Sequence, residues 1–96
     1  MLKSDELIID KEFEELLPVL TPDESENLEQ SILKNGLLDP IKIWEEPKTG
    51  RFIIIDGHNR YRILKKNNIS LNYWDYKIIY ADELPTRDDV KRWMLE

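Results

Sequence analysis

The sequence contains no cysteine and a single histidine, His58. The lack of cysteine excludes disulfides, thiolate nucleophiles and zinc sites with cysteine ligands. One histidine is too few for a multi-histidine metal site within one chain, so no metal-binding residues are predicted. No apolar run approaches the roughly 20 residues that a membrane-spanning helix needs, and the N-terminus lacks the apolar core of a signal peptide. We therefore expect a cytoplasmic protein without membrane contact.

The length of 96 residues allows one domain. A chain of this size usually buries about 60–65% of the surface that its unfolded state exposes, which is enough for one modest core. Hydrophobic residues make up 41% of the chain and charged residues 35%, a mixture typical of soluble globular domains. Residues 1–96 are accordingly expected to form a single domain.

The net charge of −6 is unevenly distributed along the chain. A surface this acidic argues against non-specific binding to DNA or to anionic membranes. Residues 1–50, however, hold 5 Lys and 13 Asp or Glu, whereas residues 51–96 hold 9 Lys or Arg and 7 Asp or Glu. The basic residues gather in residues 51–66, where Asp56 is the only acid. This segment is either a solvated helix face or part of a binding site.

The first part of the chain predicts a strand and a helix. Residues 7–9 form a short apolar run that is typical of a strand. A helix is predicted to begin after Thr21, which can cap it, with Pro22 at the first helical position and Glu24 placed to close a capping box. The helix is predicted to end at Gly36, because glycine readily adopts the positive φ of a helix C-terminus.

A hairpin and two further helices are predicted downstream. Residues 41–44 alternate like a half-buried strand, and residues 46–50 form a turn to the next strand. Residues 52–55 are continuously apolar, as expected of a strand covered on both faces. This strand runs directly into Gly57, after which helical spacing begins. A last helix is predicted to start at Thr86, with no stop signal before the end of the chain.

Residues 73–80 are rich in aromatic and β-branched residues and predict another strand. Three of its aromatic rings share one face and are expected to pack in the core: Trp74, Tyr76 and Tyr80. Tyr73 lies on the opposite face and is expected to be exposed. Trp44 is expected either in a second core layer or in a dimer contact. Together these elements predict an α+β fold, with a small mixed β-sheet and about three helices.

The junction of the 52–55 strand with the following helix is the place where binding chemistry is expected. The N-terminus of a helix presents free backbone N–H groups and the positive end of its dipole, and Gly57 lets a ligand approach the backbone closely. The guanidinium groups of Arg60 and Arg62 suit bidentate contact with phosphate. His58 and Asn59 lie in the first turn, where both side chains can donate hydrogen bonds. This pattern predicts a phosphate site.

Asp56 differs from its neighbours in this segment, because a carboxylate beside a bound phosphate repels it. Two interpretations are open. The side chain can cap the following helix, or it can take part in chemistry by holding Mg²⁺ or by positioning an attacking hydroxyl. One carboxylate and one histidine do not make a two-metal nuclease site, so nuclease activity is not expected.

Two motifs occur in a specific order. A helix ends in Gly36-Leu37 and leads through Pro40 into a strand, and after the hairpin residues 54–61 read Ile-Ile-Asp-Gly-His-Asn-Arg-Tyr. This combination resembles the N-terminal domain of the ParB/sulfiredoxin superfamily, also labelled the ParB-like nuclease domain. The resemblance covers roughly residues 7–79 and implies the ParB/sulfiredoxin-like fold.

Partition ParB proteins carry the motif Gly-Glu-Arg-Arg-x-Arg, which cradles the triphosphate of CTP. The resemblance places Gly57 on its glycine and Arg60 and Arg62 on its second and third arginines. His58 stands where that family has Glu, and Asn59 replaces its first arginine. The resemblance therefore implies a phosphate pocket and, with it, a CTPase-like nucleoside triphosphatase activity.

Two other branches of the superfamily share the same turn. Sulfiredoxins read Gly-Cys-His-Arg there, and His58 occupies the position of their catalytic cysteine, which excludes that reductase activity. Free-serine kinases resemble this sequence in pairing a Gly-His motif with a preceding Asp. That likeness would make Asp56 a catalytic carboxylate.

The resemblance implies, first, a nucleotide-binding module of a DNA-associated partition or regulatory protein, from a plasmid, a chromosome or a mobile element. Gly57, His58, Asn59 and Arg60 would bind the phosphates of a nucleoside triphosphate carried with Mg²⁺, aided by Arg62. DNA would be bound only through a helical region outside these residues, and a homodimer is an expected partner state. The alternatives are a small-molecule kinase that uses Asp56 and a protein-interaction domain with a degenerate pocket.

Overall fold

The computed structural model describes residues 6–96. Its elements follow one another in this order: β1 (Leu7–Ile8), α1 (Lys11–Glu14), α2 (Pro22–Asn35), β2 (Ile41–Glu45), β3 (Phe52–Asp56), α3 (His58–Lys66), the short 3₁₀ helix η2 (Tyr73–Asp75), β4 (Tyr76–Ile79) and α4 (Arg87–Leu95). Within the described residues, no helix is long and apolar enough to cross a membrane. The short helix α1 is an addition to the three helices predicted from the sequence.

The four strands form one mixed sheet in the order β1-β3-β2-β4. Strands β2 and β3 pair antiparallel through the predicted hairpin, with Ile43 opposite Ile54. Strand β1 runs parallel to β3, and β4 runs parallel to β2. The predicted α+β class with a small mixed sheet is therefore confirmed.

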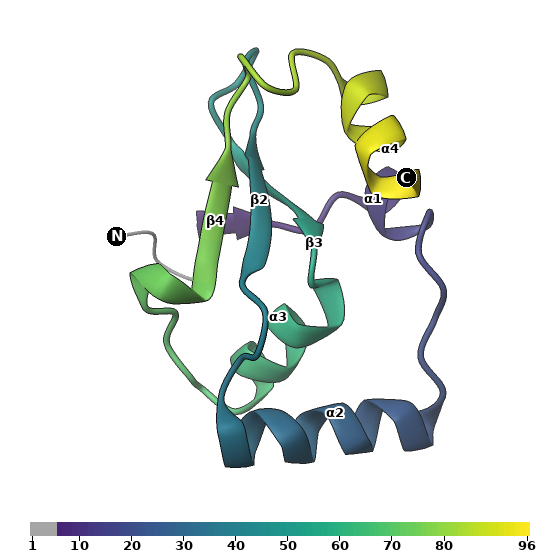
Figure 1. Ribbon diagram of the computed structural model, residues 1–96, viewed down its shortest axis with the longest axis vertical. Coiled ribbons are helices and arrows are strands. Elements are labelled where there is room, and N and C mark those ends of the chain that lie inside the picture. Colours follow the sequence, from purple (N-terminus) through teal and green to yellow (C-terminus); the bar gives the residue numbers. More distant parts are fainter. Residues whose placement is uncertain (1–5) are drawn as a thin grey trace.

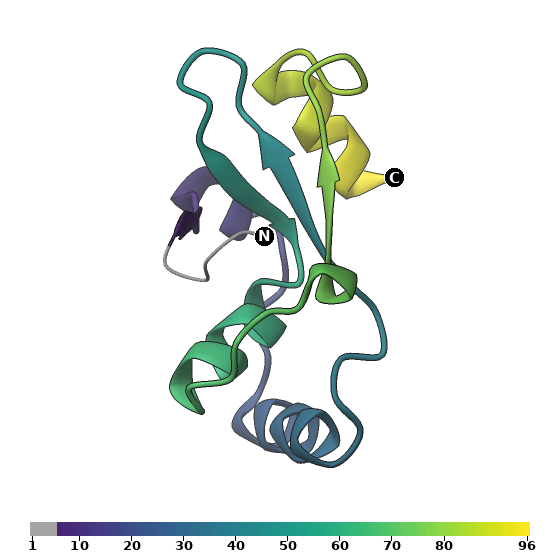
Figure 2. The same cartoon turned by 90° about the vertical axis from the view of Figure 1, so that its left-hand side faces the viewer.

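The sheet separates two hydrophobic clusters, and helices cover both of its faces. Ile54 of β3 packs with residues of α2 and α3 on one face. Its neighbours Ile53 and Ile55 pack with residues of α1 and α4 on the other. Figures 1 and 2 show α3 between the strands and α2, with α1 and α4 on the opposite side. The continuously apolar run of β3 thus reflects burial on both faces, as predicted.

The capping signals in the sequence mark the helices correctly. Thr21 caps α2, its hydroxyl accepting from the N–H of Glu24, while the Glu24 carboxylate accepts from the N–H of Thr21. The C-cap Gly36 has a φ of 73°, which a glycine adopts without steric cost. Thr86 and Asp89 form the same reciprocal pair at the start of α4. These local contacts fix where the two helices begin.

The predicted strand over residues 73–80 is partly wrong. Residues 73–75 form η2, and only Tyr76–Ile79 joins the sheet. The 3₁₀ turn breaks the two-residue alternation, and β4 is an edge strand. Trp74 is therefore 64% exposed and Tyr80 48% exposed, contrary to the expected core positions, whereas Tyr73 is exposed as predicted.

Trp44 belongs to the second core layer, which was one of its two predicted roles. Its side chain is 1% exposed, so the alternative of a dimer contact is wrong. Its indole N–H donates to the carbonyl of Leu84 over 2.8 Å. The ring meets Phe13 edge-on, with centroids 6.0 Å apart. The polar atom of this large side chain is thus satisfied inside the core.

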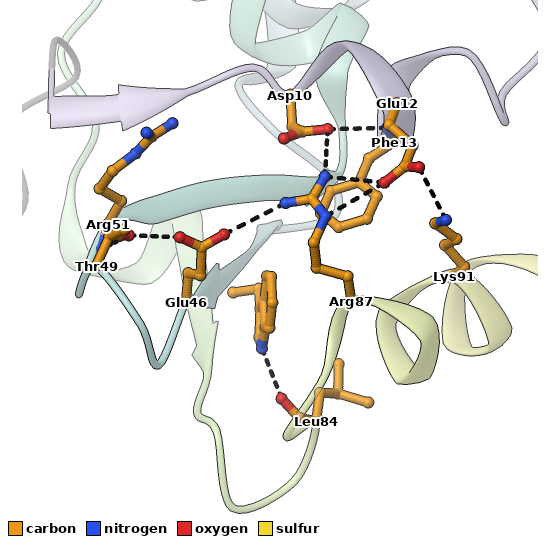
Figure 3. A network of polar contacts seen from close by, with 10 residues as sticks. Asp10, Glu12, Phe13, Glu46, Thr49, Arg51, Leu84, Arg87 and Lys91 are labelled. Atoms are coloured by element: carbon orange, nitrogen blue, oxygen red, sulfur yellow. Dashed lines mark hydrogen bonds and ion pairs between the residues drawn. The ribbon is translucent and has the colours of Figure 1, made fainter.

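Arg87 connects three separate segments above this second layer (Figure 3). Its guanidinium binds Asp10 at 2.8 Å, Glu12 at 3.0 Å and Glu46 at 3.3 Å. It also lies 4.4 Å from the centre of the Phe13 ring. Burial alone would raise the pKa of Asp10, but hydrogen bonds from Arg87 and from the N–H of Phe13 outweigh it and lower that pKa. The network fastens α1 and the β2–β3 turn to the start of α4.

Candidate functional site

The junction between β3 and α3 has the geometry of an open helix N-terminus. Strand β3 ends at Asp56, and Gly57 occupies the N-cap position with no side-chain hydrogen bond to the helix. The first backbone hydrogen bond of α3 runs from the N–H of Tyr61 to the carbonyl of Gly57, with a donor–acceptor distance of 2.9 Å. The N–H groups of the first turn therefore remain available to an anion.

Gly57 is required here for two reasons. Its φ of 93° lies in the region that favours glycine. A Cβ atom at this position would also lie 2.9 Å from Nη2 of Arg60. The guanidinium of Arg60 consequently packs directly over the glycine, at the N-terminal end of α3.

Arg60 is held in place by two acceptors. Its Nη1 donates to the carbonyl of Asp39 at 2.8 Å, and its Nη2 donates to the Asp56 carboxylate at 3.2 Å. Nζ of Lys42 lies 3.9 Å from the same carboxylate and also donates to the carbonyl of Pro40. Asp56 therefore lies between two cations and does not cap α3, which corrects the capping interpretation.

Lys42 is a residue that the sequence analysis did not single out. The β2–β3 register places it opposite Asp56, so it brings a positive charge to the β3–α3 junction. The alternation of residues 41–44 was visible in the sequence. The register of the hairpin was not, because it depends on how the turn and a bulge between Lys42 and Ile43 align the strands.

Arg62 is oriented differently from Arg60. Its guanidinium forms an ion pair with Glu14 of α1. The hydrogen bond from Arg62 lowers the pKa of Glu14 below its ordinary value. The structure thus gathers Asp56, Gly57 and Arg60 in one place and turns Arg62 toward α1.

A cleft with two adjoining lobes lies between the N-terminus of α3 and the segment that joins α1 to α2. The lobes have volumes of about 270 and 350 Å³. They share four lining residues: Leu17, Pro18, His58 and Asn59. Asp56, Gly57 and Arg60 line the first lobe, and Glu14 and Arg62 line the second. All the predicted site residues therefore border one continuous cleft.

His58 is more deeply buried than the sequence suggested. It is 2% exposed although it is the first residue of α3. Neither ring nitrogen has a hydrogen-bond partner among residues 6–96. Burial lowers the pKa of His58 below its ordinary value, so the ring is neutral at pH 7. An uncharged imidazole with two unused polar atoms thus borders both lobes of the cleft.

Another cleft of about 330 Å³ lies between the β2–β3 turn and the start of α4, lined by Trp44, Lys48 and Arg87 among others. The guanidinium of Arg87 is already bound by three carboxylates. The α3 cleft is therefore the better candidate for an anionic ligand.

The described residues do not form a metal site of their own. No group of three or more His, Cys, Asp or Glu side chains is placed to hold a metal ion within residues 6–96. The Asp56 carboxylate is engaged by Arg60 and Lys42. Any Mg²⁺ at this cleft would accordingly be carried by the phosphates of a nucleotide, which is a common way for this ion to bind.

Comparisons with known proteins agree with the fold. The family model of the ParB N-terminal domain matches residues 5–72. The chain is also similar to the C-terminally truncated chromosome-partitioning protein ParB from Caulobacter crescentus, whose crystal structure is a complex with CTP-gamma-S. The TM-score is 0.71 at 18% sequence identity, and the match covers 97% of this chain and 48% of that one. No curated protein sequence matches the chain.

The likeness to the Caulobacter protein shows a shared fold. The chain spans about half the length of that ParB chain. The family match includes the whole of the β3–α3 junction and of the segment that covers the cleft.

Proposed function

The chain belongs to the ParB N-terminal domain family, and we propose that it is a nucleotide-binding module. In this proposal the cleft holds the phosphates of a nucleoside triphosphate at the N-terminus of α3. The observation that carries the proposal is the meeting of three features in the first lobe: an uncapped helix start, a glycine with positive φ at the N-cap, and the guanidinium of Arg60 that packs over this glycine.

Each residue of the first lobe would have a separate role in binding the phosphates. The N–H groups at the start of α3 would donate to the phosphate oxygens. Arg60 would supply a bidentate contact to the phosphate. Its hydrogen bonds to Asp39 and Asp56 fix the position of the guanidinium before the ligand binds. Lys42 adds a second positive charge that offsets the repulsion between Asp56 and the ligand.

Arg62 would bind phosphate only after its ion pair with Glu14 is broken. Its guanidinium is paired with Glu14 in the second lobe. A phosphate that reached this lobe would have to replace the Glu14 carboxylate as its partner. We therefore assign the primary phosphate contact to Arg60 and a secondary one to Arg62.

CTP is the first nucleotide to test, because the Caulobacter ParB structure is a complex with a CTP analogue. His58 and Asn59 differ from the residues that partition ParB proteins carry at these positions, so ATP, GTP and ADP belong in the same experiment. Mg²⁺ would be bound with the nucleotide. We further propose that the module serves a DNA-associated partition or regulatory protein, with DNA contacts outside these 96 residues.

No contact described above supports either of the two alternative functions, the small-molecule kinase or the protein-interaction domain. A kinase would need Asp56 as a catalytic group, and its carboxylate is held between Arg60 and Lys42. The protein-interaction alternative rests on a degenerate pocket, whereas the cleft keeps the glycine and one of the predicted arginines in place. Both stay predictions.

Isothermal titration calorimetry with the four nucleotides and Mg²⁺ tests the proposal. Arg60→Ala should weaken binding by about 30- to 100-fold, or about 2–3 kcal/mol, because charge-assisted hydrogen bonds to a phosphate are lost. Arg60→Lys, which keeps the charge without the bidentate geometry, should lose less.

Arg51→Ala is the matched control, because this exposed arginine lies in the β2–β3 turn at the other end of β3 from the cleft. It should bind the nucleotide like the unmodified protein. Equal losses in Arg51→Ala and Arg60→Ala would indicate a general charge effect and contradict the site. Absence of binding for all four nucleotides would contradict the function itself.

A further inference from the structure

His58 occupies an unusual position for an ionisable side chain. It is 2% exposed, borders both lobes of the cleft and leaves both ring nitrogens without a partner among the described residues. A buried polar atom without a partner costs on the order of 1–3 kcal/mol. His58 bears this cost at the edge of the cleft, where a bound anion would change the electrostatic environment of its ring.

The charges around His58 come from four groups on three neighbouring segments. Glu14 lies on α1, Asp10 just before α1, Asp56 at the end of β3 and Arg62 one turn further along α3. Each carboxylate already has a cationic partner: Arg62 for Glu14, Arg87 for Asp10, and Arg60 with Lys42 for Asp56.

Each of these carboxylates is already paired with a cation, and burial outweighs their combined effect on the His58 ring. In the free protein the ring is accordingly neutral, with one nitrogen carrying a hydrogen and the other a lone pair. An anion bound in the cleft would place near His58 a negative charge that is not already paired with a cation.

We propose that His58 takes up a proton when a phosphate group enters the cleft, so that nucleotide binding is coupled to protonation and tightens as the pH falls from 8 to 6. This inference rests on the proposed function and deepens it. Because both ring nitrogens are enclosed, the phosphate acts on the ring through its charge across a short distance. The proton comes from solvent and stays on the ring while the ligand is bound.

The size of the expected change in affinity follows from the Coulomb interaction between the bound phosphate and the His58 ring. A unit negative charge about 5 Å from the ring, at an effective dielectric constant of about 20, favours the protonated form enough to raise its titration midpoint by about two pH units. Affinity for the anion should therefore increase about five- to tenfold between pH 8 and pH 6. Protonation of the phosphate itself acts in the opposite direction.

NMR gives a direct test because His58 is the only histidine in the chain. Its ring C–H signals are followed from pH 8 to pH 5 with and without sodium tripolyphosphate, a probe that carries the phosphate charge without a base. The titration midpoint should lie below 6.5 in the free protein and at least one pH unit higher with the probe. Backbone amide shifts in α3 report whether the probe is bound.

Calorimetry with CTP and Mg²⁺ at pH 8 and pH 6 supplies the second readout, with His58→Gln as the control that cannot titrate. The pH-dependent gain in affinity should be present in the unmodified protein and absent from the variant. If the α3 amide signals shift with the probe but the titration midpoint of His58 does not change, the proton coupling is overturned while the nucleotide-binding function is not contradicted. No α3 response to tripolyphosphate or to any of the four nucleotides would overturn both.

Discussion

At the residue scale, Gly57 combines a backbone requirement with a packing requirement. Its φ of 93° is strained for any residue with a Cβ atom, and such an atom would meet the guanidinium of Arg60 at 2.9 Å. The guanidinium is the far end of a flexible side chain, so it can move aside. Substitution at position 57 should therefore harm the site more than the fold.

Gly57→Ala should reduce the free energy of unfolding by about 1 kcal/mol, the cost of a left-handed backbone for a non-glycine residue. It should also weaken nucleotide binding at least several-fold, because the displaced Arg60 loses its bond to Asp39. Gly50→Ala is the matched control, since Gly50 has a φ of 69° with open space around it. Urea denaturation and calorimetry should show similar losses of stability but a loss of binding only in Gly57→Ala. Normal binding by Gly57→Ala would contradict the assigned position of Arg60.

At the element scale, a single side chain of α4 joins parts of the fold that are distant in sequence. Arg87 binds Asp10 beside α1, Glu12 within α1 and Glu46 after β2, while packing on the ring of Phe13. Burial alone would lower the pKa of Arg87, but hydrogen bonds to Asp10 and Glu12 raise it above its ordinary value. The second hydrophobic cluster depends on these elements staying together.

Arg87→Ala should lower the free energy of unfolding by about 1–2 kcal/mol, a value reduced from that of fully buried pairs because the side chain is 37% exposed. Arg92→Ala serves as the control, since Arg92 lies on the same helix, is 73% exposed and, among residues 6–96, forms an ion pair only with the nearby Asp89. That variant should change stability by no more than about 0.5 kcal/mol. Chemical denaturation of the two variants compares them directly, and equal effects would show that the network contributes nothing beyond a surface pair.

At the scale of the whole molecule, charge is arranged so that basic groups are matched by acidic ones. Lys66 pairs with Glu29, and Arg62 pairs with Glu14, so two of the positive side chains of α3 are matched by residues of the acidic half. The net charge stays at −6. This distribution suits a small anion in a cleft better than a long polyanion across a surface.

The 96-residue chain should accordingly not bind duplex DNA with a dissociation constant below about 0.1 mM at physiological salt. Fluorescence anisotropy with a labelled duplex of mixed sequence measures this, and repeating it at low salt tests for a purely electrostatic contact. A micromolar affinity at physiological salt would contradict the placement of DNA contacts outside these residues.

The local elements could be predicted because their signals lie within a few residues of one another. Thr21 with Glu24 and Thr86 with Asp89 close capping boxes over three residues, and Gly57 marks the start of α3 through its own backbone. The expectation for residues 73–80 failed at Trp74 and Tyr80, where a 3₁₀ turn interrupts the alternation just before a short edge strand. That expectation assumed a regular strand with one buried face.

The sequence by itself determined the α+β class, the glycine junction after a doubly buried strand, and the run of polar residues that follows this junction. Only the tertiary structure decided which of them face one another. Arg62 meets Glu14 across 48 residues, Lys42 reaches Asp56 through the hairpin register, and His58 is enclosed beside the α1–α2 segment. These contacts join residues far apart in the chain, so they depend on sheet order and helix packing, which no local pattern encodes.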